Sequence, residues 1–290
     1  MFGMVFFIFT KKKNVFKNLV PFLFILFSLS SGFSQEKIKG DRNVVSKETQ
    51  IYPFKKLVLS EKFDVVLIED DNASIEIETD ENLHEYLKFE VIDSVLSFKT
   101  TAKIVSSRKL EIKVQYTKEL REIELLESSE VSALSNINTA VMTLKTSDNS
   151  RAYLNVRSPF FNLISNGKSK SRLNIDSKDV NLELNDYSTL EALVTCETLT
   201  ANIYMHAKAI LEGNSNQLLL NTIASSDFEG KNLTVNTCTL NAEDTSDITL
   251  NVIEVVTINA SGNSDVILYG NAKVNLETFT GSAMLQKKEL

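Results

Sequence analysis

One short pattern of apolar and polar residues returns nine times between Leu120 and Leu285. Its fixed point is a small residue, serine in eight of the nine repeats, and successive fixed points lie 18 to 21 residues apart. The nine fixed points are Ser129, Ser150, Ser169, Ser188, Ala207, Ser226, Ser246, Ser264 and Ser282. A constant period of this length is the signature of a solenoid, in which each repeat adds one coil to a shared core.

Apolar residues stand at constant offsets from each fixed point. The residue six positions earlier is Ile123, Leu144, Leu163, Leu182, Ala201, Leu220, Leu240, Ile258 or Leu276. The residue eight positions earlier is also apolar, except in the first repeat, where Arg121 stands. After the fixed point, apolar residues alternate with polar ones, as in Ile248, Leu250 and Val252, which is typical of a half-buried strand. Each repeat therefore predicts two short strands and two corners.

Stacking such repeats in register allows every backbone N–H to find a carbonyl on the next coil. The predicted fold is all-β, a right-handed parallel β-helix of about 19 residues per coil over residues 120–290, with the hand taken from the chirality of parallel crossovers. Residues 35–119 form a β-rich N-terminal part, which is either separate or a continuation of the same solenoid. Its strands are expected between residues 51 and 116, where period-two alternation such as Ile75-Glu-Ile-Glu-Thr occurs.

One helix is expected in the N-terminal part, over residues 80–87. Asp80 is suited to cap its first turn, and Leu83 and Leu87 would lie on one face.

The first 34 residues carry the pattern of a secretory signal. Lys11, Lys12, Lys13 and Lys17 precede a short apolar run that begins at Leu19, and Gly32-Phe33-Ser34 supplies small residues for cleavage before Gln35. The apolar run is too short to predict a membrane span, so none is expected in the mature chain. The predicted location is outside the cytoplasm, in the periplasm, on the outer surface or in the medium.

Composition and net charge limit the kinds of molecule that the protein is expected to bind. Apolar residues make up 43% of the chain and charged residues 24%, which predicts a folded rather than a disordered protein. Removing residues 1–34 takes away four lysines and no acidic residue, which changes the net charge from −7 to −11. Nucleic acid is excluded as a partner, because phosphate binding requires a basic surface.

The two cysteines are predicted to remain free thiols. Cys238 occupies an inward position of the repeat, whereas Cys196 lies two coils earlier in a different register. Coils spaced about 4.8 Å apart would place the two residues farther apart than the roughly 7 Å that a disulfide tolerates between Cα atoms. Both side chains are therefore expected to be buried and to act as small apolar groups.

The sequence contains no nucleotide-binding loop, nucleophile elbow or paired-histidine motif. His84 and His206 have no partner histidine, so packing or surface roles are expected for both. One acidic constellation stands out, because Asp227, Asp247 and Asp265 each follow a fixed point in successive repeats, with Glu243 and Asp244 nearby. Such a ladder would bind a cation, with Ca²⁺ as the candidate, or would be a solvated acidic corner.

The chain also resembles a known family. The segments that show this resemblance are the signal, the stretch from Phe54 to Leu59, Val65-Val-Leu-Ile-Glu-Asp, Thr79-Asp-Glu-Asn-Leu-His-Glu-Tyr-Leu and the coils marked by a serine. In these it is similar to the putative auto-transporter adhesin, head GIN domain proteins of Bacteroidetes-type bacteria, over about residues 50 to 285. The resemblance implies an exported β-helical protein, with adhesion suggested by the family's name, and it supplies no catalytic residues.

Three hypotheses for function follow. The first is an exported, non-enzymatic binding protein or adhesin that uses its lateral surface to contact a glycan, a cell-surface protein or another copy of itself. The second is a polysaccharide-active lyase or hydrolase that uses the acidic ladder, and the third is a structural component of the cell envelope. An enzyme would need aromatic platforms and basic residues near the acids, and the chain contains no tryptophan.

Overall fold

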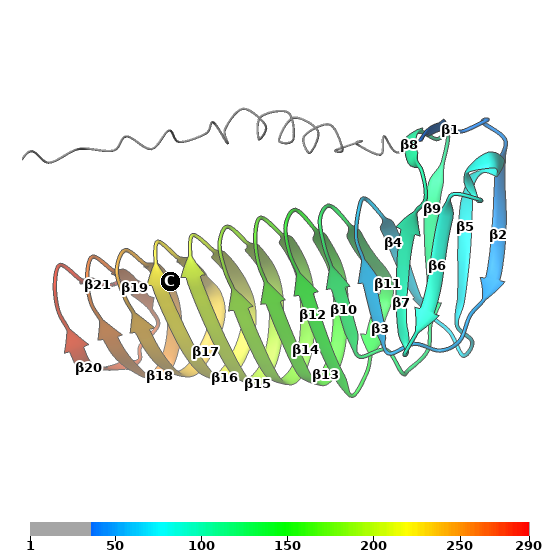
Figure 1. The fold of residues 1–290 in the computed structure, drawn as a ribbon. Helices are drawn as coiled ribbons and strands as arrows, with labels where there is room; N and C mark the ends of the chain where they lie inside the picture. Colours follow the sequence, from blue (N-terminus) through cyan, green and yellow to red (C-terminus); the bar gives the residue numbers. More distant parts are fainter. Residues whose placement is uncertain (1–35, 290) are drawn as a thin grey trace, which may run out of the picture. The chain divides into compact units, whose positions relative to one another are not determined.

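A computed structural model describes residues 36–289, and the predicted signal and its cleavage site lie outside these residues. A compact unit begins at Ile38. Its regular structure is almost entirely β, and the described residues contain no α-helix (Figure 1). The predicted all-β parallel β-helix is confirmed.

Six long strands each make up one coil of the solenoid. They are β13 (Arg151–Ser165), β14 (Lys170–Leu184), β15 (Thr189–Met205), β16 (Lys208–Ala224), β17 (Asp227–Ala242) and β18 (Asp247–Ala260). Each pairs in parallel with the next, and the register stacks Leu182 on Ala201, Leu220, Leu240 and Ile258 in turn. All five side chains are buried, so the predicted inward position is confirmed.

Each coil presents two faces. Inward and outward side chains alternate from Arg151 to Ser158, the alternation changes phase at the Pro159–Phe160 corner, and it resumes at Phe161. We name the sheet formed by the first half of each coil face A and the sheet formed by the second half face B. Face A also contains β4 (Asp64–Glu69), β11 (Glu130–Asn138), β19 (Asp265–Tyr269) and β21 (Met284–Lys287). Face B also contains β3 (Lys56–Leu59), β10 (Glu122–Leu125), β12 (Val141–Thr146) and β20 (Lys273–Phe279).

The corner that precedes face A depends on a left-handed residue in each coil. The residues with positive φ at this corner are Glu61, Glu127, Asp148, Gly167, Asp186, Met205, Ala224, Asp244, Gly262 and Gly281. In seven of these coils a buried serine stands two positions later, and the hydroxyls of Ser129, Ser169 and Ser246 donate to the carbonyl three residues earlier. The serines therefore close the corners and present no hydroxyl surface to a ligand.

The last predicted fixed point, Ser282, is wrong by one residue. β20 contains a bulge, because Ile258 pairs with Leu276 but Asn259 pairs with Thr278, which leaves Glu277 as an extra residue. The register of β21 then aligns Asp265 with Met284, so Ala283 is the structural counterpart of Ser264. Ser282 is exposed, unlike the other fixed points.

Residues before position 120 contribute coils to the same ladder. β3 stacks on β10 and β4 on β11, both in parallel. On their other side, β7 (Val95–Thr100) pairs in parallel with β3, and β9 (Leu110–Tyr116) pairs in parallel with β4. The chain therefore forms one coil, adds another on its outer side, and then crosses back to continue from β10.

Antiparallel strands cover this first end of the solenoid. β5 (Ser74–Asp80) pairs with β9 and with β2 (Val44–Gln50), and β6 (Leu87–Ile92) pairs with β7. We call β2, β5, β6, β7 and β9 the N-terminal cap. Two short strands, β1 (Lys37–Lys39) and β8 (Lys103–Ser106), complete the described elements.

The expected helix over residues 80–87 is wrong. Only a single 3₁₀ turn, η1 (Glu81–Leu83), forms, and no side chain caps it. Asp80 Oδ2 instead accepts a hydrogen bond of 2.7 Å from the backbone N–H of Arg108, and Leu87 begins β6. Leu83 and Leu87 are both buried, as the apolar spacing predicted, but they reach the core from a turn and a strand rather than from one face of a helix.

The prediction for the cysteines is confirmed. Cys196 and Cys238 are free and buried, and they occupy different faces of the solenoid. Burial raises the pKa of the Cys238 thiol to about 12 and raises the pKa of the Cys196 thiol, which lies 3.3 Å from Ser215 Oγ. Both therefore behave as inert core residues at neutral pH.

Candidate functional site

The acidic residues singled out in the sequence lie along face A and at the corner before it. The register pairs Asp227 with Asp247 and Asp247 with Asp265, so these three carboxylates occupy one outward column in successive coils. Glu243 and Asp244 are exposed at the corner and do not belong to the column. Within residues 36–289, no group of three or more His, Cys, Asp or Glu side chains is arranged to hold a metal ion. A binding role for these five residues stays a prediction.

This column carries a stretch of basic residues between acidic residues along the solenoid. From β11 to β19 it contains Glu130, Arg151, Lys170, Thr189, Lys208, Asp227, Asp247 and Asp265. Opposite charges meet at both ends of the basic stretch. Arg151 lies 3.7 Å from Glu130 Oε2 at one end, and Lys208 Nζ lies 2.6 Å from Asp227 Oδ2 and 3.7 Å from Glu229 Oε2 at the other. Sequence reasoning considered only the acidic end. The basic residues could have been found by comparing the residue after each fixed point.

The two histidines have local partners. His84 Nε2 lies 3.0 Å from the backbone oxygen of Val45, and the His206 ring stacks on Tyr187 with ring centroids 4.9 Å apart. His84 is half-buried and His206 is exposed, which agrees with the packing or surface roles expected for them.

A groove lies on face A beside the charged column, and no sequence pattern predicted it. It has a volume of about 640 Å³ and crosses the coils from β11 to β16. Its main lining side chains are Tyr153, Asn155, Arg172, Asn174, Glu191, Leu193, Ile210 and Glu212. Register irregularities occur at both ends, between Ser132 and Asn136 in β11 and between Ile210 and Gly213 in β16. Bulges bend a strand out of the plane of its sheet. The two irregularities therefore bend the surface at either end of the groove, and the hollow lies between them.

The groove combines apolar side chains with polar groups that are already paired. Leu193 is 51% exposed and Tyr153 36% exposed, so both offer apolar surface to a ligand. Arg172 Nε lies 2.8 Å from Glu191 Oε2, and the Asn174 amide donates to Asn155 Oδ1. Because the central charges neutralise one another, the floor of the groove suits a ligand that has hydroxyl groups and apolar edges but little charge.

Face B is mainly structural by comparison. An asparagine ladder runs along four coils, in which Asn221, Asn241 and Asn259 each donate a side-chain hydrogen bond to the asparagine of the preceding coil, beginning at Asn202. These amides satisfy one another and hold the register of the coils. A smaller hollow of about 470 Å³ lies beside Phe160 on the same face.

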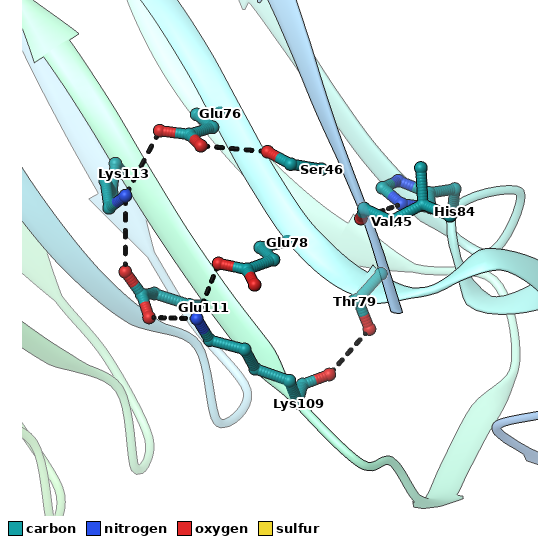
Figure 2. Close-up of polar contacts among 9 residues, drawn as sticks. All are labelled: Val45, Ser46, Glu76, Glu78, Thr79, His84, Lys109, Glu111 and Lys113. Atoms are coloured by element: carbon teal, nitrogen blue, oxygen red, sulfur yellow. Dashed lines mark hydrogen bonds and ion pairs between the residues drawn. The ribbon is translucent and has the colours of Figure 1, made fainter. Parts of the chain in front are cut away.

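The outer surface of the N-terminal cap carries an ion-pair cluster (Figure 2). Lys113 Nζ lies 3.2 Å from Glu76 and 3.5 Å from Glu111, and Lys109 lies 3.0 Å from Glu111 and also contacts Glu78. The hydrogen bond from Ser46, followed by that from Lys113, lowers the pKa of Glu76, and Lys109 lowers the pKa of Glu111. The cluster connects β2, β5 and β9 through side-chain contacts.

We expect the cap to lose local stability in acid. The pKa values of Glu76 and Glu111 are lower in the folded protein than the ordinary value of 4.5. The two ionised carboxylates therefore contribute fully to the stability of the cap above pH 4.5. This contribution is lost as the pH falls through their lowered pKa values, because the same groups bind protons at a higher pH in the unfolded state. The protection factors of the β5 amides, which correct the exchange rates for their intrinsic pH dependence, should fall over this window at low salt. Glu76→Gln should reduce this fall, and the protection factors of the β15 amides serve as the unaffected control.

The family model described as "Putative auto-transporter adhesin, head GIN domain" matches residues 53–192 and 160–272. The chain belongs to this family. The match covers the solenoid from β3 to β19 and most of the cap, which confirms the resemblance predicted from the sequence.

Solved structures of low sequence identity share the fold. The chain is 17% identical to a "putative adhesin from Parabacteroides distasonis ATCC 8503", with a TM-score of 0.66 over 87% of this chain and 100% of that one. It is 16% identical to a "putative adhesin from Parabacteroides merdae ATCC 43184", with a TM-score of 0.63 over 87% and 99% of the two chains. A "Putative lipid binding protein" from P. distasonis is 16% identical, with a TM-score of 0.60 over 87% and 100%.

The search of curated proteins gave no match to the chain. No helix among the described residues is both long and apolar enough to cross a membrane.

Proposed function

We propose that this protein is an exported, non-enzymatic adhesin that binds an extended glycan chain in the groove on face A. The groove carries the proposal, because it places exposed Tyr153 and Leu193 beside the amides of Asn155 and Asn174. A sugar ring presents an apolar C–H face together with hydroxyl groups, and this lining offers a partner for each. Family membership and the similar structures called adhesins support a binding role.

The arrangement of charge favours binding over catalysis. The acidic column lies on β17, β18 and β19, whereas the groove extends only from β11 to β16. A ligand seated in the groove would therefore contact the Arg172–Glu191 pair rather than the three aspartates. A paired arginine and glutamate orient hydroxyl groups but leave neither side chain free as a general acid or base.

A glycan array probed with the purified protein tests the proposal. Tyr153→Ala and Leu193→Asp should each weaken binding to the captured glycan by about tenfold or more, as expected for a central contact in an interface. Tyr187→Ala is the matched control, because Tyr187 is 59% exposed but lies at a corner away from the groove. The bound glycan should be recovered uncleaved.

Three outcomes would reject this function. They are binding that the groove variants do not change, cleavage of the glycan that is lost when Asp227, Asp247 and Asp265 are replaced, and capture of a protein ligand but no glycan. Export is part of the same proposal, and the amino terminus of the exported protein should be Gln35.

A further inference from the structure

The two ends of the solenoid differ in how their strands are covered. The N-terminal cap closes the first end with antiparallel strands (Figure 1). At the other end, β20 pairs only with β18 and β21 only with β19 among the described residues. We call the outer edge of β20 and β21 the tail edge. Its backbone N–H and C=O groups form a template on which another strand can pair.

The tail edge also leaves core positions open. Leu276 occupies the same inward position as Ile258, and Phe279 the same position as Ala260. Ile258 and Ala260 are buried, whereas Leu276 is 52% exposed and Phe279 38% exposed. An apolar patch of this kind, bounded by unpaired strand edges, favours association with a surface that provides both apolar contacts and backbone hydrogen bonds.

We propose that the tail edge binds the tail edge of a second copy of this chain, which forms a two-fold symmetric dimer. The sequence of β20 supports this occupant, because Lys273-Val274-Asn275-Leu276-Glu277 is complementary to itself when two copies run antiparallel. With Asn275 on the two-fold axis, Val274 packs against the partner's Leu276 and Lys273 faces the partner's Glu277. An isologous contact of this type closes after two copies.

The cap disfavours association of a tail with the first end of another molecule. On the side of face A, its edge strand β2 is exposed along Ser46–Gln50, a polar and charged stretch that offers no apolar contact. On the side of face B, the edge strand β6 carries one strongly exposed apolar residue, Ile92, and alternates it with the charged residues Lys88 and Glu90. Such a head-to-tail contact would also repeat without closing and would produce filaments. Charged and polar edge residues are a common means of preventing pairing of this kind.

Sedimentation equilibrium of the full chain tests the dimer. The wild-type chain should sediment as a dimer, and Leu276→Asp should weaken dimerisation at least tenfold. Leu219→Asp is the matched control, because Leu219 is an exposed leucine on face B at the middle of the solenoid and should leave the dimer unchanged. Lys273→Glu and Glu277→Lys should each weaken dimerisation, and combining them should restore it.

A cysteine variant tests the position of the axis independently. Asn275→Cys should form an intermolecular disulfide under mild oxidation, because directly opposed residues in antiparallel strands lie about 4.5–5.5 Å apart between Cα atoms, within disulfide range. Thr257→Cys, one coil inside the same column, should not cross-link. Native Cys196 and Cys238 are buried and give no background. A monomer at about 100 μM, head-to-tail filaments, or a dimer that neither Leu276→Asp nor the charge changes affect would overturn the proposal.

Discussion

Replacement of Leu240 by alanine is expected to reduce the free energy of unfolding by about 2–5 kcal/mol. Leu240 has no exposed surface and stacks in register between Leu220 and Ile258, which are also fully buried. The shortened side chain would leave a cavity that the neighbouring coils cannot fill, because each is held in place by continuous backbone pairing on both sides. Urea denaturation followed by far-UV circular dichroism measures the effect.

The control for this substitution is Leu219→Ala. Leu219 lies one coil earlier on the same face, but its side chain points outward and is 39% exposed. We expect its replacement to change the free energy of unfolding by no more than about 0.5 kcal/mol. Equal losses for the two variants would contradict the assignment of inward and outward positions.

Replacement of Gly213 by alanine is expected to be destabilising by a comparable amount. Gly213 has a φ of +107°, and a Cβ atom at this position would lie 2.2 Å from the backbone oxygen of Val194. The strained backbone and the forced displacement of a neighbouring coil together should lower the free energy of unfolding by about 2–6 kcal/mol. Thermal denaturation, compared at equal protein concentration, would show a lower melting temperature.

Asn214→Ala provides the comparison for Gly213. Asn214 is the next residue of β16, and its side chain is exposed. This substitution should leave the melting temperature nearly unchanged, since exposed side chains away from special backbone sites contribute little. A Gly213→Ala protein that melts like the wild type would mean that the β16 irregularity is not rigidly held.

The groove and the cap could not be predicted from the sequence, because both depend on contacts between distant segments. β3 and β10 are adjacent strands although about 60 residues separate them, and no local pattern specifies that β7 and β9 stack on the outer side of β3 and β4. The groove lies between irregularities in β11 and β16, and a bulge changes the register without changing the composition. The extra residue Glu277 in β20 misled the assignment of Ser282 for the same reason.

The sequence by itself determined the solenoid, its period and the inward positions from Leu144 to Ile258, because one apolar pattern must face one core in every coil. It also determined which carboxylates share a column, since Asp227, Asp247 and Asp265 have the same offset in their repeats. Only the tertiary structure decided that residues 80–87 form a turn and a strand, because pairing with β7 outweighs weak helical spacing. The tertiary structure alone also decided that the N-terminal cap covers one end of the solenoid and that the groove lies on face A, since both depend on how separate strands pack together.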